Sequence, residues 1–191
     1  MLALVVGLGN PGARYRGTRH NVGFDWVDRA GAALGARWKA APRYQAEVAE
    51  WRVDDRTLWA IKPLTYMNHS GRAVAPIARA KGLEPGAILV VHDELDLPPG
   101  TARLKAGGGH GGHNGLRDLT EQLGSREFLR LRLGIGHPGD RSQVTPYVLS
   151  RPSPDERTAY EAAMDRALEA LPDLAAGHWQ RAVNHLHAPG G

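Results

Sequence analysis

The sequence contains no cysteine, and aromatic residues make up only 6% of its 191 residues. Without thiols the chain cannot form disulfides, thiolate metal sites or a cysteine nucleophile. No apolar run approaches the ~20 residues that a membrane-spanning helix needs. The opening segment MLALVVGLGN lacks the basic flank and the small-residue cleavage site of a signal peptide. We therefore expect a cytoplasmic protein without a membrane anchor.

Hydrophobic residues make up 42% of the chain, which predicts a folded protein with a buried core. The length suits one domain spanning residues 1–191. Lysine and arginine (24) outnumber aspartate and glutamate (20), giving a formal net charge of +4. This small excess fits an arginine-rich surface as well as a basic face for a polyanion, and charge alone does not decide between them.

Apolar periodicity predicts strands and helices that alternate along the chain, with one antiparallel hairpin among them. This pattern is typical of an α/β fold with one twisted, mixed β-sheet flanked by helices. Pro76 should kink the second helix or delay its start. We expect strands at 2–6, 46–53, 57–61, 87–91 and 129–135, and helices at 21–34, 70–81, 114–123, 153–171 and 174–186.

The first predicted strand runs into glycines spaced as in a dinucleotide-binding turn, Gly7-x-Gly9-x-x-Gly12. Such a site also needs a helix that begins at the third glycine and an acidic residue about 20 positions later, at the end of the next strand. The following residues, ARYRGTRH, have no apolar helical face, and Asp28 falls inside the first predicted helix. The glycines are better explained by a sharp turn after the strand, which would leave Asn10 exposed at its tip.

Polar residues follow the predicted strands, where ligands of α/β sheets bind. Asp93 could orient His20 so that the other imidazole nitrogen accepts a proton. No serine lies in a Gly-x-Ser-x-Gly turn, so we expect the histidine to activate water directly. Asn10, Asn68 and Asn114 could bind peptide groups or an oxyanion, or could serve as turn and helix-cap residues, Asn114 in particular.

The segment 107–115 contains six glycines and could form a mobile wall that adapts to a substrate. His110 and His113 have the spacing of a metal-binding pair, but the sequence offers no suitable third ligand near them. We therefore expect no metal site.

Four segments, taken in order, resemble the bacterial-type peptidyl-tRNA hydrolases: GLGNPGARYRGTRHNVGF, KPLTYMNHSGRAV, VVHDELDLPPGTARLKAGGGHGGHNGL and LRLGIGHP. The resemblance implies a monomer, without metal or organic cofactor, that cleaves the ester joining a peptide to the terminal ribose of tRNA. Some plant-organelle relatives act instead as intron-splicing factors. The presence together of Asn10, His20, Asn68, Asp93 and Asn114 favours the enzyme.

The same resemblance implies a role for each matching residue. His20 would be the general base, Asp93 its orienting partner, and Asn10 a neighbour of the scissile ester. The peptide would be held by Asn68 and Asn114, with Tyr15 and Met67 lining the cleft and His113 and Asp96 in support. Lys105 and Arg132 would bind a tRNA phosphate, although Arg130 is close enough in sequence to be mistaken for Arg132. Residues 144–151 resemble the family's flexible lid.

Overall fold

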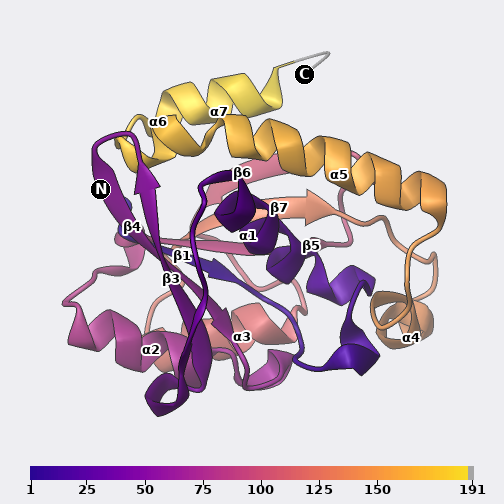
Figure 1. Cartoon of the computed structure of the whole chain (residues 1–191). Coiled ribbons are helices and arrows are strands. Elements are labelled where there is room, and N and C mark those ends of the chain that lie inside the picture. The colour runs from indigo at the N-terminus through magenta and orange to yellow at the C-terminus, as the bar shows by residue number, and fades with distance from the viewer. Residues whose placement is uncertain (189–191) are drawn as a thin grey trace.

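A seven-stranded β-sheet runs through the centre of the molecule (Figure 1). The computed structural model describes residues 1–188, so the last three residues of the expected domain lie outside it. The strands follow the order β2-β3-β4-β1-β5-β7-β6. Their bounds are β1 Leu4–Gly7, β2 Lys39–Ala41, β3 Ala46–Val53, β4 Arg56–Pro63, β5 Ile88–Glu94, β6 Ala102–Ala106 and β7 Leu129–Gly134.

The sheet is mixed, as expected. Strand β1 pairs in parallel with β4 and β5, and β5 pairs in parallel with β7. Strand β3 is antiparallel to both β2 and β4, and β6 is antiparallel to β7. The carboxyl ends of the four parallel strands therefore meet at one edge of the sheet, and the polar segments of the sequence follow them there.

Helices cover both faces of the sheet (Figure 1). One core lies beneath α1 (Val22–Ala33), α5 (Pro154–Glu169), α6 (Leu171–Ala175) and α7 (Trp179–His187). The other lies beneath α2 (Gly71–Ala80) and α3 (Asn114–Leu123). A short helix, α4 (Val144–Val148), follows β7 near the edge with the polar segments. Within residues 1–188, no helix combines the length and hydrophobicity that crossing a bilayer requires.

The glycines after β1 allow α1 to lie close against the sheet. A Cβ atom on Gly7 would lie 2.5 Å from the Gly23 carbonyl oxygen, and one on Gly9 would overlap the Phe24 ring. A Cβ atom on Gly23, in α1, would lie 2.4 Å from the Val91 carbonyl oxygen of β5. Helix α1 begins ten residues after Gly12, and only a three-residue 3-10 turn, Ala13–Tyr15, follows that glycine directly, so no α-helix starts at the third glycine as a dinucleotide site requires. The structure agrees with the rejection of that site.

Most of the predicted elements are confirmed to within a few residues, and β3 and α3 at both ends. Two predictions need correction. Helix α2 starts at Gly71 and continues through Pro76, so the proline does not delay it. The two predicted helices at 153–171 and 174–186 are three helices, α5, α6 and α7, with one break at Ala170 and another where Gly177 takes a φ of 81°. The short elements β2, β6 and α4 were not predicted.

Two glycines of α1 offer a matched test of this packing. Gly23→Ala should lower the free energy of unfolding by about 1–3 kcal/mol, because the new methyl group overlaps backbone of β5 and of the segment after β1. Gly31→Ala adds the same methyl where the nearest atoms are 3.5 Å away, and should be neutral or stabilising by up to ~1 kcal/mol. Urea unfolding of both variants measures the difference, and equal stabilities would contradict the close approach.

Candidate functional site

A cavity of about 230 Å³ opens at the carboxyl ends of β5 and β7. Its wall contains His20, Asp93, His113 and Asn114, together with residues of the glycine-rich segment. Helix α4 adds Val144, Thr145 and Val148 to its wall. The predicted residues gather here because β5 delivers Asp93, the turn before α1 delivers His20, and the loop before α3 delivers His113.

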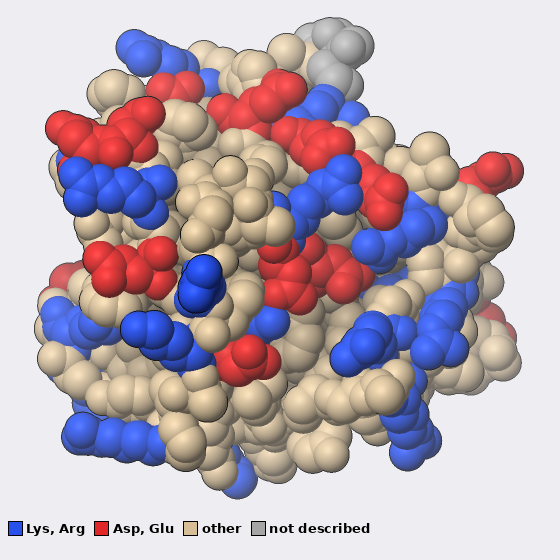
Figure 2. All heavy atoms as spheres, in the orientation of Figure 1, with Lys and Arg blue, Asp and Glu red and all other residues tan. Residues whose placement is uncertain are grey.

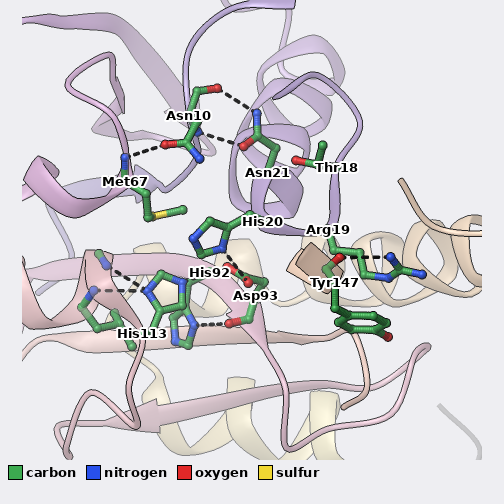
Figure 3. Close-up of polar contacts among 12 residues, drawn as sticks. Asn10, Thr18, Arg19, His20, Asn21, Met67, His92, Asp93, His113 and Tyr147 are labelled. Atoms are coloured by element: carbon green, nitrogen blue, oxygen red, sulfur yellow. Dashed lines mark hydrogen bonds and ion pairs between the residues drawn. The ribbon is translucent and has the colours of Figure 1, made fainter. Parts of the chain in front are cut away.

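Asp93 lies at the centre of this site (Figure 3). His20 Nδ1 is 2.8 Å from Asp93 Oδ2, and His113 Nε2 is 2.8 Å from Asp93 Oδ1. Each carboxylate oxygen therefore accepts from one imidazole. The predicted contact between His20 and Asp93 is present, although 73 residues separate the two in the chain.

The tautomer of His113 follows from its other contacts. Its Nδ1 accepts hydrogen bonds from the backbone N–H groups of Gly115 (3.1 Å) and Leu116 (3.3 Å), at the start of α3. A nitrogen that accepts carries no proton, so the ring is neutral and Nε2–H donates to Asp93. His113, rather than Asn114, is therefore the N-cap of α3, which corrects the expectation for Asn114.

Electrostatics keep Asp93 ionised. Burial alone would raise the pKa of this carboxyl, but His20 and His113 outweigh that effect and hold the pKa well below its usual range. Burial alone would likewise lower the pKa of His20, but the charge of Asp93 and its hydrogen bond raise the pKa above the ordinary 6.5. With Nδ1–H donated to Asp93, the His20 Nε2 is the nitrogen left to accept a proton.

A third histidine, His92, was not anticipated at the site. It is 2% exposed and lines the cavity, with its ring 5.2 Å from that of His113. Burial lowers its pKa to about 3, so its ring is neutral at physiological pH. Its Nδ1 donates to the Asp93 carbonyl oxygen, and within residues 1–188 its Nε2 has no hydrogen-bond partner.

Asn10 is buried, at 7% exposure, which corrects the expectation of an exposed turn tip. Its Oδ1 accepts from the Met67 N–H at 2.7 Å (Figure 3). Asn21 holds its backbone from the other side, accepting from the Asn10 N–H and donating to the Asn10 carbonyl oxygen. This contact brings the segment after β1, the turn before α1 and the segment before α2 together.

The other predicted substrate residues do not all share the cavity that His20 lines. Asn114 lines the cavity and also a neighbouring one of about 270 Å³, to which Asn68 belongs. Asn68 does not line the cavity that holds His20. Tyr15 packs edge-on against Tyr66, with ring centroids 6.2 Å apart. Of these three residues, Asn114 shares a cavity with His20, whereas Asn68 and Tyr15 do not line it.

Three basic residues lie side by side under the glycine-rich segment. Lys105 is paired with Arg130 across the β6–β7 ladder, and Arg132 follows two residues along the same face. Lys105, Arg130 and Arg132 all line the cavity, together with the acidic Glu94 and Asp96. By contrast, acidic and basic side chains are interspersed on the face that carries α5 (Figure 2).

Arg130 and Arg132 differ in what they contact. Arg130 is buried, and its guanidinium donates to the carbonyl oxygens of Gly108, Gly109 and Arg126. It therefore anchors the glycine-rich segment from below, a role that the sequence did not indicate. Arg132 is partly exposed, and its ion pair with Glu94 is long, at 3.8 Å.

His20, Asp93 and His113 are also the one group of three potential metal ligands found among residues 1–188. The spacing of His110 and His113 suggested a different pair, but His110 is not in this group. His20 Nδ1 and His113 Nε2 already lie at hydrogen-bonding distance from the Asp93 carboxylate, and a cation bound there would have to replace both contacts. The donor set thus suits proton transfer without any rearrangement.

Comparison with known proteins agrees with this geometry. Residues 4–190 match the family model described as Peptidyl-tRNA hydrolase. The chain is 53% identical to the "Peptidyl-tRNA hydrolase" of Halorhodospira halophila, covering 97% of this chain and 95% of the relative. The corresponding protein of Azotobacter vinelandii is 52% identical over 97% and 96%.

Solved structures give the same result. The crystal structure of peptidyl-tRNA hydrolase from Acinetobacter baumannii is 41% identical and superimposes with a TM-score of 0.95. The match covers 98% of this chain and 95% of that one. Sequence and fold agree over nearly the full length, and the chain belongs to the peptidyl-tRNA hydrolase family.

Proposed function

We propose that this protein hydrolyses the ester between a peptide and the terminal ribose of tRNA by direct attack of water, with His20 as the general base. The observation that carries the mechanism is the contact between His20 Nδ1 and the buried Asp93 carboxylate. It fixes the ring, leaves Nε2 basic, and stabilises the imidazolium that forms when a water proton is taken. No covalent intermediate is needed, because an ester of this kind is already activated.

Each neighbouring group has a place in this reaction. His113 donates to Asp93 and holds the carboxylate towards His20. The Oδ1 of Asn10 is occupied by the Met67 N–H, which leaves its Nδ2 to donate to the ester carbonyl as negative charge develops there. Asn68 and Asn114 would hold the peptide main chain, while Met67 and Tyr15 line the approach.

The tRNA part of the substrate would bind through Lys105 and Arg132. Both line the cavity, and a phosphate is attracted to such a pair by charge. Arg132 suits this role better than Arg130, whose guanidinium already donates to three backbone carbonyls. Asp96 lies in the same wall and would support this side of the site.

The proposed reaction also bears on the oligomeric state, the location and the cofactor requirement of the enzyme. We infer that it works as a monomer in the cytoplasm, where its substrate arises, and that it needs no metal or organic cofactor. Equal discharge of peptidyl-tRNA with and without a chelator would agree with the last point.

Removing the base should stop the chemistry while leaving binding intact. His20→Ala is expected to lower kcat by about 10²–10⁴-fold, the usual contribution of a general base. The affinity for tRNA should change little, because His20 carries no phosphate contact in this scheme. Single-turnover discharge of peptidyl-tRNA and a filter-binding titration measure the two quantities. His185→Ala, an exposed histidine on α7, is the control, and near-normal turnover of His20→Ala would remove His20 from the mechanism.

The pH dependence of kcat/KM should report the raised pKa of His20. The base must be unprotonated, so activity should fall as the pH drops through a value above 6.5. Asp93→Asn removes the charge that raises this pKa, and burial then lowers it. The acidic limb should therefore move to lower pH while the plateau falls. Asp173→Asn, on α6, is the control, and an unmoved limb in Asp93→Asn would contradict the pairing.

The phosphate contact can be separated from the chemistry with two substrates. Lys105→Ala should weaken tRNA binding and reduce the slope of log K against log salt by about 1. It should leave the cleavage of a small N-acyl amino acid ester unchanged. Lys81→Ala, at the far end of α2, provides a control of equal charge change. Equal losses on both substrates would show that Lys105 does not contact phosphate.

A further inference from the structure

Arg19, the residue before His20, makes a set of contacts that the proposed reaction does not use. Its side chain is almost fully buried, at 9% exposure. One terminal nitrogen donates to the Tyr147 carbonyl oxygen (3.1 Å) and to Ser150 Oγ. The other donates to both carboxylate oxygens of Glu156, at 3.0 and 3.3 Å. One guanidinium thus joins the turn of His20 to two later segments of the chain.

The Tyr147 ring adds to this arrangement. The guanidinium carbon of Arg19 lies 4.0 Å from the centre of that ring, in a cation–π contact (Figure 3). Tyr147 belongs to α4, and its hydroxyl donates to the Ile135 carbonyl oxygen just beyond β7. Helix α4 is therefore held to the sheet at one side and to Arg19 at the other.

The backbone strengthens the same connection. The Arg19 N–H donates to the Ser150 carbonyl oxygen at 3.0 Å, and Arg151 Nε donates to the Arg16 carbonyl oxygen at 3.1 Å. Glu156 in turn closes the capping box at the start of α5. Residues 150–151, which follow α4, are thus hydrogen-bonded to residues 16–19, which lead into His20.

These contacts of Arg19 lie beside the cavity of the proposed reaction. Helix α4 contributes Val144, Thr145 and Val148 to the wall of the cavity that His20 also lines. A displacement of α4 would therefore widen the cavity and pull on the turn of His20 at the same time. Because the ring must meet both Asp93 and a water molecule, a misplacement of ~1 Å costs about 10²-fold in rate.

We propose that Arg19 is a positioning residue that couples α4, the wall of the cavity, to the placement of His20. It touches no reacting atom. It acts by keeping the turn of His20 and the segment 147–150 in one arrangement. The proposal rests on the proposed function for its kinetic part only, because the placement of α4 and of the His20 ring can be observed without turnover.

Arg157 gives a matched control. It follows Glu156 on α5 and is also partly buried, but it pairs with Asp25 of α1 (2.7 Å) and Glu161 (3.3 Å) and lines no part of the cavity. Arg19→Gln and Arg157→Gln each remove one positive charge from an ion pair that joins α5 to an earlier segment of the chain. Only the first releases α4.

The test compares these two variants in three measurements. Arg19→Gln should lower kcat by about 10–10²-fold with little change in KM. It should speed hydrogen exchange of the backbone amides among residues 144–150, where Pro146 has none, by about tenfold or more. It should also lower the His20 pKa measured by NMR, because the contact with Asp93 loosens. Arg157→Gln should change none of these, and Arg19→Lys should recover part of kcat through Glu156.

A fourth variant examines the coupling itself. If Arg19 acts through α4, then Arg19→Gln combined with Tyr147→Ala should lower kcat no further than the more impaired single variant does. The proposal is overturned if the Arg19→Gln and Arg157→Gln variants match in kcat and in exchange at 144–150. It is also overturned if exchange is faster but the His20 pKa and kcat stay as in the wild type. If unaltered protein does not discharge peptidyl-tRNA, the proposed function fails, whereas the exchange and NMR results still test the coupling.

Discussion

The structure depends on one buried carboxylate and the two imidazoles that hold it. Asp93 is 3% exposed, and an isolated charge so deep in a protein is costly unless hydrogen bonds compensate for it. His20 and His113 provide that compensation from opposite sides. Three elements meet as a result: the central strand β5, the turn before α1, and the start of α3. The contact on which the proposed reaction depends is also one that orders the edge of the sheet.

The glycines of the chain serve two different needs. Gly7, Gly9 and Gly23 remove side chains where α1 lies against β1 and β5, and the close approach brings the turn of His20 within reach of Asp93. In the segment 107–112, Gly107, Gly108, Gly111 and Gly112 take positive φ values instead. That segment is shaped by backbone conformation and held by Arg130. Glycine therefore permits close packing of α1 in one part of the chain and positive φ angles in another.

The sheet and most helices could be predicted from the sequence because their signals are local. The aliphatic run before His92 marks β5, and Ser153 with Glu156 marks the start of α5. Strand β6 was missed because two of its five residues are basic side chains in a run only five residues long. The break between α6 and α7 depends on a single glycine, which propensity tolerates within a helix.

The site was only partly predictable, because its contacts join distant segments. The resemblance identified His20 and Asp93, but the burial of Asn10 depends on Met67, 57 residues away. Arg130 and Arg132 lie on the same face of one strand, so alternation could not separate them. The carbonyl groups that occupy Arg130 belong to residues 108, 109 and 126. Likewise, only the fold could show that Arg19 reaches Ser150 and Glu156.

The strand order has a consequence for how the molecule is made. Strand β7 lies between β5 and β6, so β6 has no neighbour in the sheet until residues 129–134 have been synthesised. Helix α7 then closes the outer side of β6, where His187 accepts from the Leu104 N–H. A nascent chain paused before β7 would expose one edge of β5 and lack one wall of the cavity. The ribosome must therefore complete most of this polypeptide before the cavity of the proposed reaction can assemble.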